Sequence, residues 1–414
     1  MKKAGLVAFT VIFSLLAFAV GFGGATGALM LSQPSVSGST TTINFIVNKN
    51  DSTAAVAARL EKAGLIRNAL VFRFYARQKH LDTSIEPGLY KLSPNMSMVQ
   101  IITALQKGKP DETVIKVLDG LRVLQYPTEI QGLKNFNADN FIKIATTGNW
   151  MDGTPVNKDF WFVAPKAKNA TAALEGYLYP DTYFMDPAAD ETEVIKRMLG
   201  TLGEHLCPGP TNNPDAAGEY FSDKAQCRQH ATTVKVGSKD VNIFDAMNAA
   251  YFTKDDVVGL YDSLTVASIT ARERGDNVAA VANVFHNRYL ELLGKSGGVG
   301  DTAGFFQADS TVQYARDTDK PPAVWPINWP PLAGAAAKDI SPNNPYNTYT
   351  HKGLTPGPIA APIWDLIVAA ATPKSPKDFP YFYFLHDKCG KTYLAKDNAD
   401  FQANAIPHIN DHNC

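Results

Sequence analysis

The sequence has no excess of charge of either sign, few cysteines and no internal repeat. Its 414 residues contain 39 Lys and Arg against 40 Asp and Glu, for a net charge of −1. Because proteins that bind nucleic-acid phosphates need a basic surface, we expect no nucleic-acid partner. Four cysteines are too few for a disulfide-dense scaffold. With 45% hydrophobic and 19% charged residues, wholesale disorder is excluded, and the length allows two or three domains.

An uncharged run near the N-terminus predicts export. The run from Ala4 to Leu31 follows two lysines and has 28 residues, more than the roughly 20 that a helix needs to cross a bilayer. The lysines orient the N-terminus toward the cytoplasm. We expect a cytoplasmic tip at 1–3, a transmembrane anchor at 4–31, a linker at 32–41 and an exported remainder. A cleaved signal peptide is the alternative, because small residues crowd the far end of the run.

The four cysteines form two pairs that are close in sequence. Cys207 and Cys227 flank a segment rich in Pro, Gly and Asn, and Cys389 lies 25 residues before Cys414. Since an exported chain folds in an oxidising compartment, we expect disulfides Cys207–Cys227 and Cys389–Cys414, although four cysteines allow three pairings. A metal site is the alternative, but the close CxxC or CxxxH spacing of such sites is absent. We expect no metal and no cofactor.

Turn and cap signals predict a small α+β module over residues 42–109. Asp51 or Ser52 can cap a helix that ends at Gly64. Five elements in the order β-α-α-β-α are expected, at 42–47, 53–63, 69–78, 89–92 and 98–107. A connecting region follows at 110–172, in which a strand at 112–118 is the clearest feature.

Residues 173–414 are expected to form a larger α+β domain, with the cysteine-bracketed loop 207–227 inside it. The apolar patterns predict three helices and two strands. The helices lie at 191–205, at 263–293 with an interruption at Gly275, and at 363–371, and the strands lie at 381–385 and 392–394.

Glu273 is the first candidate for chemistry. It lies four residues after Ile269, on or at the edge of the apolar stripe of its helix. A carboxyl that is partly removed from water has a raised pKa and stays protonated near neutrality, as a general acid requires. The alternative is a solvated Arg-Glu-Arg face in which Arg272 pairs with Asp276.

Two later segments, 307–314 and 347–359, are rich in neutral hydrogen-bonding and aromatic side chains. Such side chains suit sugars, whose hydroxyls need donors and acceptors and whose faces pack on rings. Ordinary loop composition explains either segment alone equally well. Both segments in one domain with a candidate acid favour a carbohydrate site.

Six short motifs, taken together, resemble the endolytic lytic transglycosylases of bacterial peptidoglycan, the MltG or YceG-like family. The similarity extends over about residues 170–405, and the module at 42–109 falls where that family carries a LysM-like subdomain. The motifs are LEGYLYPDTY at 174–183, ASITARE at 267–273, VFHNR at 284–288, QADSTV at 307–312, PYNTY at 345–349 and GLTPGPI at 353–359.

The resemblance implies an enzyme of the bacterial cytoplasmic membrane that cuts nascent glycan strands between MurNAc and GlcNAc. It leaves 1,6-anhydro-MurNAc ends and terminates strand elongation. The family's catalytic glutamate corresponds to Glu273, which protonates the glycosidic oxygen and then accepts the proton of the C6 hydroxyl. Peptidoglycan strands are the implied partner, with cell-wall synthesis enzymes nearby. Substrate-binding positions are implied for Gln307, Asp309, Ser310, Thr311, Asn347, Tyr349 and Asn404.

The chain departs from the family pattern at three places. Ala271 replaces the first acid of a Glu-Lys-Glu motif, Ser310 replaces the proline of Asp-Pro-Thr, and the late Glu-His-Asn motif, which ends at Asn404, lacks its histidine. Two other functions stay open. One is a muramidase that uses water, with Glu273 and Asp309 as acid and base, and the other is a glycan-binding scaffold without catalysis.

Overall fold

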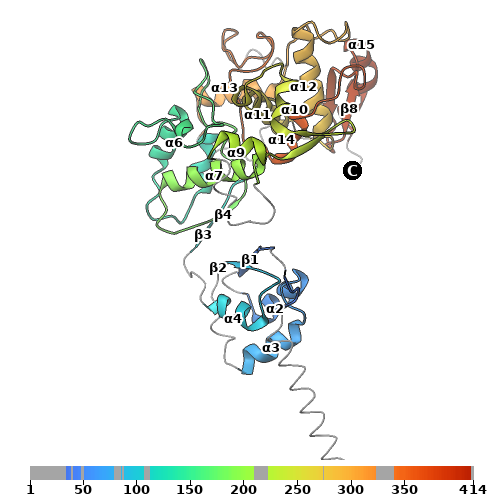
Figure 1. Cartoon of the computed structure of the whole chain (residues 1–414). Coiled ribbons are helices and arrows are strands. Elements are labelled where there is room, and N and C mark those ends of the chain that lie inside the picture. Colours follow the sequence, from blue (N-terminus) through green and yellow to red (C-terminus); the bar gives the residue numbers. More distant parts are fainter. Residues whose placement is uncertain are drawn as a thin grey trace, which may run out of the picture. The chain divides into compact units, whose positions relative to one another are not determined.

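The computed structural model describes residues 34–38, 41–47, 51–78, 85, 88–106, 112–208, 222–273, 275–322 and 340–411. The chain forms two compact units, which divide between Thr113 and Val114 (Figure 1). The predicted anchor at 4–31, linker residues 32, 33, 39 and 40, and Cys414 lie outside the described residues. Within the described ranges, no helix has both the length and the apolar character that a membrane span requires.

The first unit has the predicted order of elements. Its two strands pair antiparallel, with Ile43 opposite Leu92, and Ser52 caps the first helix by accepting a hydrogen bond from the Ala55 amide at 3.2 Å. Side chains from all five elements form a core of their own. The elements are β1 (Ile43–Val47), α2 (Thr53–Lys62), α3 (Ala69–Gln78), β2 (Gly88–Leu92) and α4 (Met98–Gln106).

In its described residues, the second unit joins helices to three two-stranded sheets, which gives the predicted α+β class. Residues of the expected connecting region 110–172 pack into the same core as the later helices. The strands are β3 (Thr113–Lys116) with β4 (Thr182–Met185), β5 (Thr233–Val236) with β6 (Lys239–Asn242), and β7 (Tyr383–His386) with β8 (Thr392–Ala395). The helices are α5 (Tyr126–Glu129), α6 (Ala138–Thr147), α7 (Glu191–Leu206), α9 (Lys224–Gln229), α10 (Ile243–Ala250), α11 (Asp256–Arg272), α12 (Val278–Leu292), α13 (Asp309–Asp319), α14 (Trp364–Ala371) and α15 (Asn398–Asp400).

Helix α11 lies at the centre of this unit and packs against α10, α12 and α14 (Figure 1). Every residue from Ser263 to Ala271 is buried, so the helix is enclosed on all sides. Its hydroxyl side chains are satisfied within the helix, as when Ser263 donates to the Gly259 carbonyl at 2.8 Å and Thr270 to the Val266 carbonyl at 2.9 Å. A rigid, buried helix therefore carries the chain to Glu273.

The predicted start of this helix at residue 263 was wrong. Helix α11 begins seven residues earlier, at Asp256, because the Asp255 side chain caps it by accepting from the Val257 amide at 3.0 Å. The predicted interruption at Gly275 is confirmed, since α11 ends at Arg272 and α12 starts at Val278.

The disulfide between Cys207 and Cys227 is confirmed, and both residues are fully buried. It joins the end of α7 to α9, with Cα atoms 5.1 Å apart. The second expected bridge includes Cys414, so this pairing stays a prediction.

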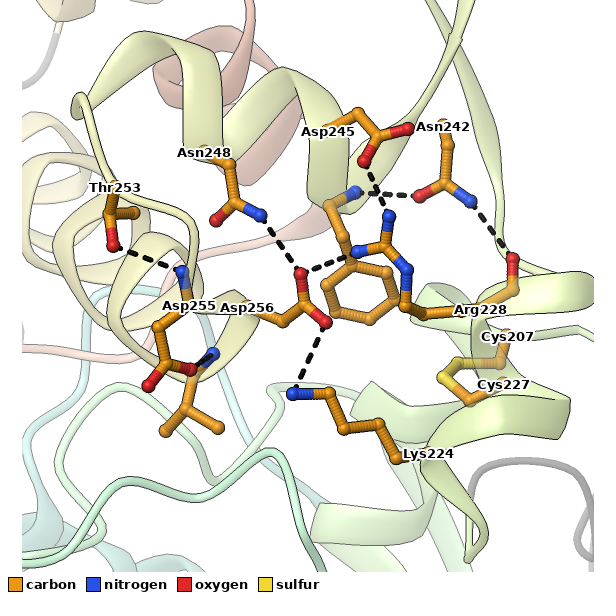
Figure 2. Close-up of polar contacts among 12 residues, drawn as sticks. Cys207, Lys224, Cys227, Arg228, Asn242, Asp245, Asn248, Thr253, Asp255 and Asp256 are labelled. Atoms are coloured by element: carbon orange, nitrogen blue, oxygen red, sulfur yellow. Dashed lines mark hydrogen bonds and ion pairs between the residues drawn. A yellow bond between two sulfur atoms is a disulfide. The ribbon is translucent and has the colours of Figure 1, made fainter.

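Helix α9, which contains Cys227, is attached to the start of α11 by side-chain contacts (Figure 2). Asp256 is only 4% exposed, and its carboxylate accepts from Arg228 at 2.5 Å and from Asn248 at 2.9 Å. Lys224 lies 3.4 Å away, and Arg228 also pairs with Asp245. A buried carboxylate is stable when it is paired in this way. Helix α9 thereby fixes the N-terminal end of the helix that leads to Glu273.

Candidate active site

A cleft of about 780 Å³ opens in the second unit, beside the C-terminal end of α11. It is lined by residues from segments far apart in the sequence. The lining residues are Glu273, Arg288, Gln307, Asp309, Tyr349, the six residues 383–388, Asn398, Phe401, Ile409 and Asn410.

Glu273 lies one residue beyond the last turn of α11 and is half-buried. Its backbone amide still donates to the carbonyls of Ile269 and Thr270, at 3.2 and 3.1 Å, so the helix holds its position. The partial negative charge of a helix C-terminus disfavours a carboxylate there. The side chain therefore faces the cleft from a helix end, and the alternative of a solvated helix face does not describe this position.

The surroundings of Glu273 favour its protonated form. Burial raises the pKa of this carboxyl, and the nearby charge of Asp309 raises it further. The Ser310 hydroxyl acts in the opposite direction, because its hydrogen bond stabilises the carboxylate. This balance suits a group that must be an acid first and a base afterwards.

The N-terminal end of α13 contacts Glu273 directly. Ser310, in the first turn of this helix, donates from Oγ to Oε1 of Glu273 at 2.7 Å. Ser310 is buried and does not line the cleft, so its contact is with the acid. Substrate binding was the role expected for Ser310, and that role stays an untested prediction.

The PYNTY loop holds the first turn of α13 in place. The Thr348 hydroxyl accepts from the Ala308 amide at 3.0 Å and lies 2.9 Å from the Thr311 hydroxyl. Asn347 and Thr311 are both fully buried, and Asn347 accepts from the Tyr349 amide at 3.2 Å. Neither residue lines the cleft, and the substrate-binding role expected for both stays a prediction.

Asp309 and Tyr349 form a pair on the cleft wall. The Tyr349 hydroxyl donates to Oδ1 of Asp309 at 2.6 Å. Burial raises the pKa of Tyr349, and the adjacent Asp309 carboxylate raises it further, so the phenol keeps its proton. Gln307 is exposed next to them, with a left-handed backbone at φ 48°. All three line the cleft.

Arg288 also lines the cleft. It is the last residue of the VFHNR motif, but no functional role was predicted for it from the sequence. Its guanidinium donates to the carbonyls of Phe382, at 2.7 Å, and Phe306. Burial lowers the pKa of Arg288 to about 10, although neighbours including Tyr383 and Glu273 favour its charged form. It is therefore a cation held beside the candidate acid.

Strand β7 and the turn after it line another part of the cleft. His386 on β7 lines it, and its Nδ1 lies 3.2 Å from the Thr392 hydroxyl. Asn404 is exposed and donates to Asp400 at 2.6 Å, and it is not among the lining residues. Among the residues that the structure describes, no group of three or more His, Cys, Asp or Glu side chains could hold a metal ion.

A second buried carboxyl, which does not line the cleft, holds α13 in place. Glu175, in the LEGYLYPDTY motif, accepts from the Val123 amide at 2.9 Å and from the Tyr314 hydroxyl at 3.0 Å. Burial raises the pKa of Glu175 to about 7, against the opposing charge of Arg122. Arg122 stacks 4.2 Å above the Tyr314 ring and donates to its carbonyl. The motif therefore positions the helix that carries Asp309 and Ser310.

Known proteins similar to this chain include two bacterial enzymes and one solved structure. An endolytic murein transglycosylase of Streptococcus pneumoniae serotype 2 is 24% identical over 99% of this chain, which spans 66% of that relative. The endolytic murein transglycosylase of Bacillus subtilis is 25% identical over 88% of this chain and 84% of its own length. A crystal structure of a yceG-like protein from Listeria monocytogenes covers 88% of this chain and 99% of its own, at 23% identity and a TM-score of 0.43.

The family model for the YceG-like family matches residues 45–406, nearly the whole chain. The matched range includes all six motifs on which the resemblance to this family rests. It also includes the cleft residues from Glu273 to Tyr349. The protein belongs to the YceG-like family.

Proposed function

We propose that this protein is an endolytic murein lytic transglycosylase. It cleaves nascent glycan strands between MurNAc and GlcNAc and leaves 1,6-anhydro-MurNAc ends. The observation that carries the proposal is the position of Glu273, a half-buried carboxyl at the end of α11, with one serine hydroxyl bonded to it and an open cleft in front. The names of the pneumococcal and Bacillus relatives support the same activity.

One carboxyl group performs both proton transfers. Protonated Glu273 donates to the glycosidic oxygen as the bond to C1 of MurNAc breaks. The resulting carboxylate accepts the proton of the C6 hydroxyl, whose oxygen attacks C1 and closes the anhydro ring. The proton count balances, because Glu273 ends the cycle protonated. The Ser310 hydroxyl stabilises the intermediate carboxylate at 2.7 Å.

Two further groups assist this chemistry. The Arg288 cation lies beside the acid and favours the carboxylate that forms in the first step. The Tyr349–Asp309 pair gives the cleft an oriented phenol and carboxylate for sugar hydroxyls. Gln307 adds an exposed amide next to them.

A muramidase that uses water is the second candidate, and one observation favours it. Asp309 lies in the same cleft as Glu273, and its charge raises the pKa of that acid, so a second carboxylate is close to the reacting bond. A hydrolase needs such a group to activate water. Against this role, Oδ1 of Asp309 is already engaged by Tyr349.

Mass spectrometry of products from uncrosslinked glycan strands tests the proposal. The parent should give internal fragments with anhydro-MurNAc ends, and Glu273→Gln should give none. Asp309→Asn should still give anhydro ends, more slowly. Reducing MurNAc ends from the parent, lost in Asp309→Asn, would establish the muramidase instead. A folded parent that binds strands without shortening them would establish the scaffold.

The location of the enzyme belongs to the same proposal. The uncharged run from Ala4 to Leu31 would anchor it in the cytoplasmic membrane with the cleft outside, near the enzymes of cell-wall synthesis. The β-α-α-β-α unit would serve as a LysM-like module. Protease treatment of intact spheroplasts should remove a tag at the C-terminus and spare one at the N-terminus. A full-length protein recovered in the soluble fraction would contradict the anchor.

A further inference from the structure

Helix α3 of the first unit exposes two large apolar side chains. Leu70 is 69% exposed and Phe74 is 70% exposed, while Phe72 and Ala76 on the opposite face are fully buried. Leu70 and Phe74 are four residues apart, so they lie on one face of the helix. Exposed apolar residues that gather in this way mark a contact surface more often than isolated ones do.

Two arginines flank this apolar pair. Arg73 and Arg77 are exposed, and the structure gives neither a hydrogen bond nor an ion pair with another described residue. Together with the start of α2 they border a groove of about 570 Å³. Asp51, which precedes the cap of α2, pairs with Arg59, and Glu61 in α2 accepts from the Ala69 amide, so both carboxylates are engaged with other groups.

The module as a whole is positively charged, like the two arginines. Residues 42–109 contain ten Lys and Arg against four Asp and Glu, whereas the complete chain has 39 against 40. The rest of the chain is therefore net acidic, and the basic charge is concentrated in the first unit. A surface of anionic phosphates would attract a module with this excess of basic residues.

We propose that the α3 face, formed by Leu70, Arg73, Phe74 and Arg77, binds the surface of an anionic lipid bilayer. The apolar pair enters the boundary between headgroups and acyl chains, while the arginines reach the lipid phosphates. The sequence limits how far the module can lie from the end of the proposed anchor. Between Leu31, where the proposed anchor ends, and Ile43, where β1 begins, the chain spans at most about 40 Å. Such a contact goes beyond the proposed catalysis, because it would fix the orientation of the module.

Site-directed spin labelling of the full chain in vesicles tests the proposal. A label at Gln78→Cys lies one turn after Phe74 on the same face and leaves the four residues intact, and a label at the exposed Lys91→Cys on β2 is the control. In vesicles with phosphatidylglycerol, the label at position 78 should become severalfold more accessible to oxygen than to a water-soluble nickel chelate. The label at position 91 should stay accessible to the chelate.

Charge-reversal variants distinguish binding by the α3 face from a general effect of net charge. Arg73→Glu with Arg77→Glu should return the label at position 78 to the aqueous phase, whereas Lys62→Glu with Lys91→Glu, which changes net charge equally, should not. Melting curves that match the parent would establish that each variant is folded.

Three results would overturn the proposal. One is an aqueous label at position 78 in anionic vesicles, and another is equal behaviour in phosphatidylcholine vesicles. The third is a label already shielded in detergent without lipid, which would assign the face to the second unit or to another copy of the chain. None of these results depends on whether the cleft cleaves glycan.

Discussion

The two units of the chain are assembled from very different ranges of sequence. The core of the first unit comes from one run between Phe45 and Leu105, and its two strands pair directly with each other. The core of the second unit draws on residues from Ile115 to Ala371, and its cleft collects side chains from Glu273 to Asn410. The first unit depends on local pattern, while the second depends on contacts between distant segments.

This difference shows where function is vulnerable. In the second unit, single long-range contacts such as Ser310 to Glu273 and Thr348 to Thr311 set the geometry of the cleft. Losing one of these contacts can change the pKa or the position of the Glu273 carboxyl without unfolding the unit. In the first unit, every element contributes to one small core, so a core defect affects the whole unit.

The largest effect should come from Glu273→Gln, which removes the only proposed proton donor. We expect cleavage of uncrosslinked strands to fall by about 10² to 10⁴-fold, because general acid–base catalysis contributes that much. The melting temperature should change little, since the residue is half-buried in an open cleft. The exposed Glu129→Gln is the matched control and should keep full activity. Equal loss in both variants would contradict the assignment.

A core truncation should break the first unit alone. Leu105 is fully buried, so Leu105→Ala should lower the free energy of unfolding of that unit by about 2 to 5 kcal/mol. Because each unit has its own core, calorimetry should show one transition moved and the other unchanged. A shift of both transitions would mean that the units unfold together.

A pH-dependent effect should appear in the second unit through Glu175. Its pKa rises from 4.5 to about 7 on folding, so the folded state binds the proton more tightly. Stability from this group is fully present below pH 4.5 and is lost as the pH rises to about 7, by about 3 kcal/mol. Glu175→Gln resembles the protonated form and should lack this loss. Identical pH dependence of chemical denaturation in the parent and in Glu175→Gln would contradict a raised pKa of Glu175 in the folded state.

The smallest effect should come from Ser310→Ala. The hydroxyl stabilises the Glu273 carboxylate, so its removal should raise the pKa of the acid further. The basic limb of the pH–rate profile should then move to higher pH by about one unit, as expected for one hydrogen bond to a charged group. Ser310→Thr keeps a hydroxyl and should restore the parent profile. An unchanged limb in Ser310→Ala would mean that this contact does not tune the acid.

The same contrast explains what the sequence predicted well. Cap and turn residues such as Ser52 act within a few positions, so all five elements of the first unit were predicted close to their observed bounds. In the second unit, the helix at 191–205 and the strands near 383 and 392 were found for the same reason. Proximity in sequence also predicted the Cys207–Cys227 bridge correctly.

The geometry of the site depends on contacts that no local pattern contains. The start of α11 was missed because its first turn buries the charged Asp256 and exposes the apolar Val258, so it lacks the expected amphipathic pattern. Arg288 is recognisable only once Phe306 and Phe382 surround it with carbonyl groups. The candidate acid was found through its neighbours in sequence, whereas its bond to Ser310 spans 37 positions.

The origin of the oxygen at the new chain end tests the central claim most directly. The parent enzyme should be incubated with uncrosslinked glycan in water enriched in ¹⁸O, and the new MurNAc ends weighed by mass spectrometry. If the C6 hydroxyl attacks while Glu273 accepts its proton, the new ends carry the anhydro mass and no ¹⁸O. New ends heavier by one water that contains ¹⁸O would contradict the single-carboxyl account and assign the cleft to hydrolysis.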